Sequence, residues 1–378
     1  MSVFPVGEYQ ARVRRAQAGL AERGLGALLL TTEAEVRYFT GFLTRFWESP
    51  TRPWFLVIPA WGNPVAVIPS IGAALMAKTW ITDIRTWSSP DPVDDGVSLL
   101  ADCLREHAGS GKIGMPMGRE SVLRMPLRDY DLLKAELGAL AIVSDGGLMA
   151  ELRAIKSEAE IACIREACAI AGRAFDRVGE IARPGVPIAH VFRRFQAICL
   201  EEGADCVPYL AGGAGPLGYD DVISPASETP LQTGDVLMLD TGLMRNGYFS
   251  DFDRNWAIGR AAPEAVSAWA RLLEATEAAR QIARPGTTAA ALYHAMHRIV
   301  GGSEAGRLGH GLGMQLTEGL SLIPGDHTVL QPGMVITLEP GITLPGSGIM
   351  VHEDVFAITA TGCEQLSPDA PRDLPVLT

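Results

Sequence analysis

The chain contains 378 residues, with 44 acidic against 32 basic side chains and a formal net charge of −12. This length favours two domains, and an acidic surface without clustered Lys or Arg excludes nucleic acid as a partner. We expect no membrane span, because prolines interrupt the longest apolar stretch, and no signal peptide, because the N-terminus shows no basic head followed by an apolar core. The six cysteines form no CxxC pair, which predicts reduced thiols and a cytoplasmic location.

The first part of the chain alternates apolar strand-like runs with amphipathic helical patterns. Helices are expected over 8–24, 92–107 and 127–137, and strands over 25–31, 54–59, 64–69 and 81–87. Such alternation is typical of a small α/β domain, which we place over residues 1–153.

The second domain, expected over 154–378, begins with a long helix and contains an internal repeat. Ser157 and Glu160 have the spacing of a capping box, which predicts the start of that helix. Three segments recur about 100 residues later in the same order. They are 182–185 with 283–286, 231–242 with 330–341, and 256–258 with 356–358. The repeat therefore predicts two helices followed by antiparallel strands in each half. Packed together, the two halves are expected to form a pseudo-twofold sheet covered by helices.

Three aspartates are predicted on one face of a hairpin in the first half of the repeat. Asn246-Gly247 favours a type I′ turn. This turn places Asp240 opposite Asp253 and leaves Asp251 on the same face. Three neighbouring carboxylates repel one another, so they are tolerated if they are exposed or if cations neutralise them.

The second half of the repeat supplies matching groups. Glu339 stands at the position equivalent to Asp240, and Glu353 follows a short apolar run. His310 lies in Gly-His-Gly-Leu-Gly, where glycines let the backbone approach a ligand closely. Carboxylates with one imidazole suit Mn²⁺, Co²⁺, Zn²⁺ or Fe²⁺, and four carboxylates balance two such ions. Two ions can share a bridging hydroxide and polarise a carbonyl.

Together these motifs resemble metallopeptidase family M24, which includes Xaa-Pro dipeptidases, aminopeptidase P and the creatinases. The residues that carry the resemblance are Asp240-Thr-Gly, Ser250-Asp251-x-x-Arg254, Gly-His310-Gly-x-Gly, Thr337-Leu-Glu339-Pro-Gly and Glu353-Asp354. The junction at 151–157, Glu-Leu-Arg-Ala-Ile-Lys-Ser, is similar to the creatinase/prolidase branch, so the resemblance covers the whole chain.

The resemblance implies an α/β N-terminal creatinase-like domain and an α+β pita-bread C-terminal domain with an internal pseudo-twofold duplication. It also implies a homodimer in which the N-terminal domain of one subunit caps the site of the other. Glu339 is implied as the catalytic proton shuttle as well as a metal ligand. The implied ligands of two divalent ions, with Mn²⁺ favoured, are Asp240, Asp251, His310, Glu339 and Glu353.

The chain departs from the family pattern at the substrate-binding histidines. Ile223 and Thr317 stand where the family carries His, Val351 stands where Arg is common, and Asp253 replaces a common Thr. We interpret Asp253 either as a support behind the metal ligands or as a structural partner of Arg254. Candidate substrate-binding residues in place of the histidines are Tyr219, Asp221, Thr317, His352, Arg52 and Trp54.

The resulting prediction is a dinuclear metal-dependent hydrolase similar to Xaa-Pro dipeptidases, in which a metal-bridging hydroxide attacks the amide carbonyl of a dipeptide or small amide. An alternative is a non-peptidase enzyme on the same fold, such as a creatinase-like or ectoine-hydrolase-like C–N hydrolase or a metal-assisted lyase acting on a small charged metabolite. A non-catalytic binding module is the third hypothesis, against which the intact ligand set argues.

Overall fold

The computed structural model describes residues 3–49, 52–109, 111–302, 306–344, 346 and 348–378. The chain divides into two compact units, Met1–Arg153 and Ala154–Thr378. Within the described ranges, no helix combines the length and the apolar character needed to cross a membrane.

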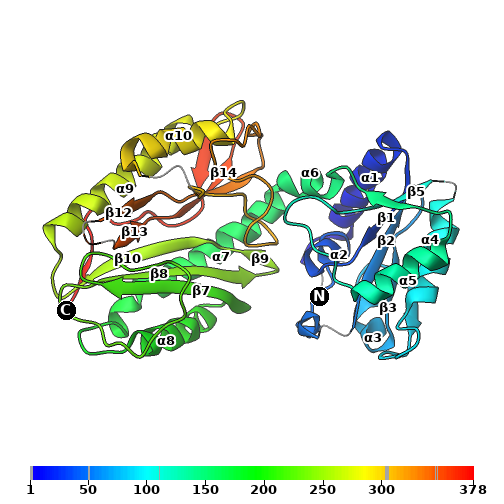
Figure 1. Ribbon diagram of the computed structural model, residues 1–378, viewed down its shortest axis with the longest axis horizontal. Helices are drawn as coiled ribbons and strands as arrows, with labels where there is room; N and C mark the ends of the chain where they lie inside the picture. Colours follow the sequence, from blue (N-terminus) through cyan, green and yellow to red (C-terminus); the bar gives the residue numbers. More distant parts are fainter. Residues whose placement is uncertain (1–2, 50–51, 110, 303–305, 345, 347) are drawn as a thin grey trace. The chain divides into compact units, whose positions relative to one another are not determined.

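The first unit is a six-stranded mixed sheet with helices packed against it (Figure 1). Its strand order is β4-β3-β2-β1-β5-β6, in which β1 pairs antiparallel with β2 and parallel with β5. The strands are β1 (Leu25–Leu30), β2 (Phe55–Pro59), β3 (Val65–Pro69), β4 (Asp83–Trp87), β5 (Lys112–Met115) and β6 (Ile142–Ser144). The helices are α1 (Val6–Glu22), α2 (Glu33–Thr40), α3 (Ala73–Met76), α4 (Val97–Ala108), α5 (Leu127–Leu137) and α6 (Leu148–Ala154). The apolar faces of α4 and α5 bury the central strands.

Helix α2 was not among the expected elements, whereas β5 and β6 are the later strands expected around the helix over 127–137, for which no bounds were predicted. Seven of the eight residues of α2 are buried, including the charged Glu35 and Arg37, and the helix is too short for its period to stand out in the sequence. Its start does carry a sequence signal, because Thr32 and Glu35 form a complete capping box.

The second unit consists of two helix pairs and antiparallel strands. Figure 1 shows α9 and α10 on the side of β12 to β14, and α8 on the side of β7. The helices are α7 (Glu158–Asp176), α8 (Ile188–Glu201), α9 (Pro263–Ile282) and α10 (Ala289–Val300). The first-half strands are β7 (Cys206–Gly215), β8 (Val236–Arg245), β9 (Tyr248–Phe249) and β10 (Phe252–Ile258). The remaining strands are β11 (Val335–Leu338), β12 (Gly341–Thr343), β13 (Ile349–Val351), β14 (Asp354–Ile358), β15 (Cys363–Gln365) and β16 (Val376–Leu377).

The two halves of this unit repeat each other down to single hydrogen bonds. The amide of Gly185 donates to the Leu231 carbonyl at 2.8 Å, and the amide of Gly286 donates to the Leu330 carbonyl at 3.1 Å. Strand β8 pairs antiparallel with β10, and β11 pairs antiparallel with β14 in the corresponding register. The predicted duplication is therefore confirmed as a structural one.

The predicted hairpin register is also confirmed. Asn246 and Gly247 have φ angles of 54° and 82°, both positive as a type I′ turn requires. Asp240 lies directly opposite Asp253 in the β8–β10 ladder. The capping box that begins α7 forms as expected, because the Ser157 hydroxyl accepts a hydrogen bond from the backbone amide of Glu160.

Candidate metal centre

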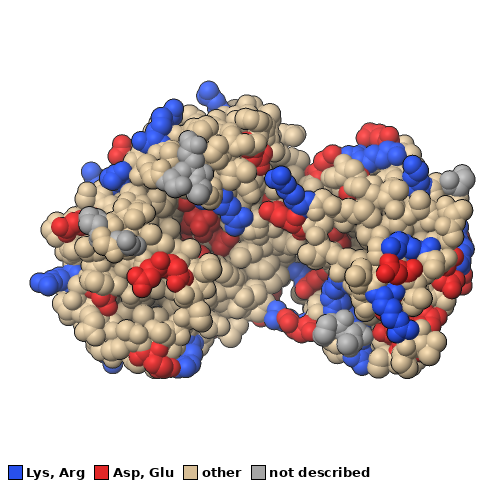
Figure 2. Space-filling view, viewed as in Figure 1, with Lys and Arg blue, Asp and Glu red and all other residues tan. Residues whose placement is uncertain are grey.

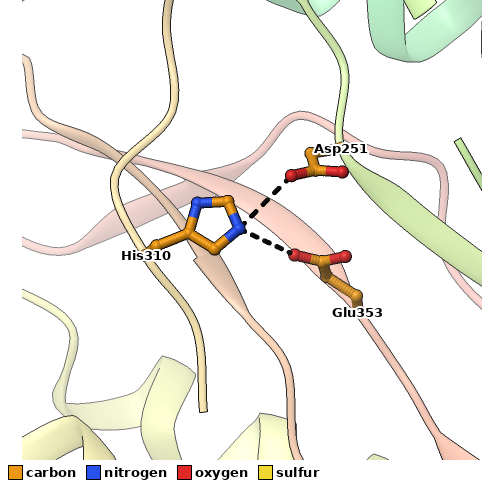
Figure 3. Close-up of side chains that lie close together, drawn as sticks. All are labelled: Asp251, His310 and Glu353. Carbon is orange, nitrogen blue, oxygen red and sulfur yellow. Dashed lines mark ion pairs between the residues drawn. The ribbon is translucent and has the colours of Figure 1, made fainter. Parts of the chain in front are cut away.

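Three ligand-type side chains from distant segments of the second unit lie together (Figure 3). His310 Nε2 is 3.3 Å from Asp251 Oδ2 and 3.8 Å from Glu353 Oε1. Each of these residues is 3% exposed. An imidazole nitrogen and two carboxylate oxygens that converge out of water are a donor set for a divalent cation.

The backbone holds His310 beside the strand end that carries Glu339. The amide of His310 donates to Thr337 Oγ1 at 3.1 Å, and its carbonyl accepts from the Thr337 amide at 2.7 Å. The amide of Glu339 donates to the Leu308 carbonyl at 3.0 Å. His310 Nδ1 lies 3.0 Å from the Gly311 carbonyl oxygen. Because a carbonyl only accepts, we assign the proton to Nδ1, which leaves the Nε2 lone pair facing the carboxylates.

Gly309 determines the path of the chain into this position. Its φ is +134°, and a Cβ added there would lie 2.3 Å from the Thr337 carbonyl oxygen. No side chain fits this position without moving the backbone that hydrogen-bonds His310.

We expect Gly309→Ala to weaken Mn²⁺ binding by at least about tenfold, because it displaces His310 from the two carboxylates. Isothermal titration calorimetry on the folded variant measures this affinity. Gly325→Ala is the matched control, since a Cβ at Gly325 meets no atom within 4 Å. An affinity in Gly309→Ala equal to that of the control would contradict the role given to His310.

Two further carboxylates belong to the same cluster. Asp240 is 8% exposed on β8, and Glu339 is half-buried just after β11. Burial, followed by repulsion from Asp251, raises the pKa of Asp240 well above its ordinary value. Burial likewise raises the pKa of Glu339 to about 7, against the opposing effect of His310. Burial, followed by repulsion from Asp251, also raises the pKa of Glu353. These carboxyl groups lie close enough to repel one another, and a bound cation would neutralise this repulsion.

Two oxygens of the cluster have no hydrogen-bond partner among the described residues. They are Asp240 Oδ1 and Glu353 Oε1, and both are buried. Buried carboxylate oxygens are normally hydrogen-bonded or bound to a metal. Figure 2 shows acidic side chains gathered in a hollow of the second unit, with a basic side chain beside them. The donor set therefore fits divalent metal.

Tyr209 is a member of the site that the sequence interpretation missed. Its hydroxyl donates a hydrogen bond to the Asp240 carboxylate, and burial together with the charge of Asp240 raises the pKa of this phenol. The signal that could have found it is the strand register, because Tyr209 lies two residues before Ala211, which pairs with Asp240. Tyr209 orients one oxygen of Asp240 and leaves the other for a ligand.

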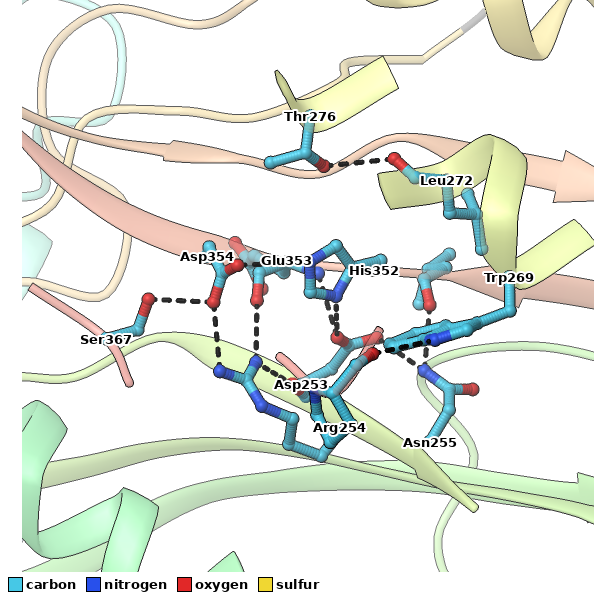
Figure 4. A network of polar contacts seen from close by, with 12 residues as sticks. Asp253, Arg254, Asn255, Trp269, Leu272, Thr276, His352, Glu353, Asp354 and Ser367 are labelled. Carbon is cyan, nitrogen blue, oxygen red and sulfur yellow. Dashed lines mark hydrogen bonds and ion pairs between the residues drawn. The ribbon is translucent and has the colours of Figure 1, made fainter. Parts of the chain in front are cut away.

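Asp253 lies behind the cluster and supports it (Figure 4). Its Oδ1 accepts from the Glu353 amide at 2.8 Å and lies 3.4 Å from His352 Nδ1. The Asn255 side-chain amide donates to Oδ2 at 3.3 Å. Burial raises the pKa of Asp253, although His352 opposes the shift. Asp253 thus fixes the backbone of Glu353, and it is Asp354 that pairs with Arg254, at 3.1 Å.

His352 lies in a buried polar network behind the cluster. The ring is 1% exposed and lies between two carboxylates, with Nε2 3.0 Å from Asp354 Oδ2. Burial disfavours the imidazolium, but Asp354 and Asp253 outweigh it and raise the pKa of His352 to about 9. His352 also packs edge-on against Trp269. Its role as a substrate-binding residue stays a prediction.

Tyr219 and Asp221 are likewise occupied by structural contacts. Tyr219 is 2% exposed, and its hydroxyl accepts from the Val351 amide at 2.6 Å. Asp221 accepts hydrogen bonds from its own loop, including the Ser224 hydroxyl at 2.6 Å. The assignment of Tyr219 and Asp221 to substrate stays a prediction. Ile223, at the position of one missing histidine, is 80% exposed.

The aromatic segment of the first unit is a packed cluster. Trp54 is 2% exposed and lies 5.4 Å from Phe42 and 5.8 Å from Trp47, measured between ring centroids. The substrate contact predicted for Trp54 stays a prediction. Arg52 is half-buried with its guanidinium over the Phe46 ring, and its role at a site stays a prediction.

A duplicated fold that encloses a buried cluster of carboxylates and one histidine is the architecture of a metallopeptidase. Residues 162–360 match the model of metallopeptidase family M24, and residues 12–155 match the creatinase/prolidase N-terminal domain. The chain belongs to family M24, and its fold is the pita-bread fold of prolidases and aminopeptidase P. The family resemblance and the fold class predicted from the sequence are confirmed, and the chain is a hydrolase of the peptidase class.

Individual relatives match between about two thirds and nearly all of the chain. The probable dipeptidase PepE of Mycobacterium bovis is 29% identical over 99% of this chain and 98% of that protein. The Xaa-Pro dipeptidase of Pyrococcus horikoshii is 31% identical over 66% of this chain and 72% of its own. The crystal structure of a prolidase from Thermococcus sibiricus superposes with a TM-score of 0.87 at 26% identity, covering 98% of this chain and 99% of that one.

Proposed function

We propose that the protein is a dinuclear metal-dependent dipeptidase. The ligands would be Asp240, Asp251, His310, Glu339 and Glu353. The observation that carries the proposal is the pair of buried oxygens without a hydrogen-bond partner on Asp240 and Glu353. They lie in the same cluster as His310, whose Nε2 is 3.3 Å from Asp251 Oδ2. Such oxygens are costly unless a cation binds them.

The charge balance supports two ions rather than one. Four carboxylates and a neutral imidazole carry four negative charges, which two divalent cations neutralise. Oxygen donors with one nitrogen suit Mn²⁺, which is the first ion to test. Homodimeric assembly and a cytoplasmic location stay predictions.

The bound ions would supply Lewis acidity toward a carbonyl and would lower the pKa of a water molecule. Glu339 would carry the proton, because it is a half-buried carboxylate of the cluster and would lie beside the attacking water. It would take a proton from the attacking water and pass it to the departing amide nitrogen. His310 would act as a neutral ligand, held in that tautomer by the Gly311 carbonyl.

A dipeptide is the favoured substrate because relatives that match most of the chain are named dipeptidases. The second candidate is a C–N hydrolase acting on a small charged metabolite. Ile223 and Thr317, which stand where the family's substrate-binding histidines are expected, favour it.

We expect the protein loaded with Mn²⁺ to release proline from alanyl-proline, and elemental analysis to give two metal ions per chain. A panel of Xaa-Pro and other dipeptides, followed by proline detection, checks the activity. His310→Ala is the inactive control, since it removes the nitrogen donor. Turnover of small C–N metabolites with no dipeptide hydrolysis would favour the second candidate.

A further inference from the structure

Arg307 places a positive charge beside the acidic cluster. It precedes His310 by three residues, and its side chain is exposed. Its Nη2 donates to Thr317 Oγ1 at 3.1 Å. Thr317 is the residue at the position of a missing family histidine, so a guanidinium lies where that imidazole is absent.

The backbone next to Arg307 lies at the cluster itself. The carbonyl of Leu308 accepts a hydrogen bond from the amide of Glu339 at 3.0 Å. Because residues 307 and 308 are adjacent, the exposed guanidinium extends from a segment that contacts a carboxylate-bearing residue of the site.

Buried contacts of the neighbouring residues hold the loop that carries Thr317. Glu318 is 8% exposed, and its Oε2 accepts from the Met314 amide at 3.0 Å. Its Oε1 lies 3.4 Å from Lys156 Nζ, in an ion pair whose side chains are both buried. Leu316 packs on Gly242, two residues beyond Asp240. Thr317 is therefore a rigid acceptor that holds one nitrogen of Arg307.

We infer that Arg307, held by Thr317, is the anchor for the carboxylate of the substrate. A guanidinium offers five N–H donors in a fixed fork, and the bond to Thr317 uses one nitrogen and leaves the other donors for an anion. A carboxylate is the ligand that matches this fork, whereas a terminal amide has no charge to pair with it.

This inference rests on the proposed function, because it assigns the end of the dipeptide that the site recognises. The competing interpretation is a surface arginine that only balances the acidic cluster. The two differ in what they predict, since charge balance affects every ligand equally while an anchor distinguishes an acid from its amide.

The test compares alanyl-proline with alanyl-prolinamide in the Mn²⁺-loaded protein and its Arg307→Gln variant. We expect the variant to raise KM for alanyl-proline about 10- to 100-fold and to leave the KM for the amide within about twofold. Arg298→Gln, which removes an exposed arginine of α10, is the matched control and is expected to change neither. Equal effects of Arg307→Gln on acid and amide would overturn the inference.

Binding measurements separate this inference from the proposed function. Calorimetry with L-proline and L-prolinamide on the Mn²⁺-loaded wild type, Arg307→Gln and Arg298→Gln needs no turnover. If proline binding is lost in Arg307→Gln and kept in the other two proteins, the anchor is supported even when no dipeptide is hydrolysed. Proline binding that is equal in all three proteins, or absent from the wild type, overturns the inference. Arg307→Gln is also expected to bind Mn²⁺ at least as tightly as wild type, because it removes a like charge; weaker Mn²⁺ binding would show a structural role instead.

Discussion

Glu339→Gln is expected to lower kcat on alanyl-proline by about 10²- to 10⁴-fold while the protein keeps its metal. The amide side chain has nearly the same shape and can still offer an oxygen, but it cannot accept a proton from water near neutral pH. The carboxylate of Glu339 follows strand β11 at the cluster, where it would lie within reach of a water held by the ions.

Turnover and metal content must be measured on the same preparation, by proline release and by elemental analysis. Glu274→Gln, an exposed glutamate of α9, is the control for an unspecific effect of the substitution. Full turnover of Glu339→Gln with both metals bound would show that another group moves the proton. Loss of metal together with turnover would show that Glu339 acts as a ligand first.

The part of the site that the sequence could predict is the part that local rules determine. The Asn246-Gly247 turn determines the register of its hairpin, and the register places Asp240 opposite Asp253 without any knowledge of the rest of the fold. The repeat then relates Asp240 to Glu339 across the duplicated domain. Turn geometry and internal symmetry are both properties of the sequence alone.

The orientation of His352 shows where such local rules end. Strand alternation through 349–356 directs His352 away from Glu353, but the structure interrupts the strand between β13 and β14. His352 and Glu353 lie in that interruption, where alternation carries no information. The contacts of His352 come from Asp253 and Asp354, and the first of these lies in the other half of the repeat.

Tyr209 and the Arg307–Thr317 pair could not be predicted for a related reason, since even the β7–β8 register that places Tyr209 near Asp240 is known only from the structure. Each contact joins segments whose proximity depends on how the strands and loops pack, and neither has a distinctive spacing. The departure of Thr317 from the family pattern marked the place, but only the structure shows that an arginine lies next to it.

The duplicated geometry also explains why the site contains an additional buried acid. In the β8–β10 ladder Asp240 lies opposite Asp253, and the register of β11 and β14 makes Glu339 and Glu353 their counterparts. Two facing acids in each half give four, and Asp251 adds a fifth. His352 neutralises Asp253, which leaves four carboxylates for metal.

Metal is expected to stabilise the protein increasingly as pH rises from about 5 to 7.5. In the metal-free protein, burial raises the pKa of Asp240, Asp251, Glu339 and Glu353 above their unfolded values. The folded state therefore holds more protons than the unfolded state, so this contribution to stability is fully present below the unfolded pKa values near 4 and is lost as pH rises through the folded ones. Metal reverses the sign, because it binds the ionised carboxylates.

Differential scanning calorimetry with and without Mn²⁺ across this pH range measures the effect. At a free concentration of about 1,000 times Kd the ion adds roughly 4 kcal/mol, which at about 2–4 °C per kcal/mol raises Tm by roughly 8–16 °C. Binding is also expected to release protons, seen as a dependence of the calorimetric enthalpy on the ionisation enthalpy of the buffer. The control is Asp326→Asn, because this carboxyl caps a loop outside the cluster and its pKa is lowered. A metal-induced rise in Tm that did not change with pH would mean that the ion binds groups already ionised at pH 5, and so not these four buried carboxyls.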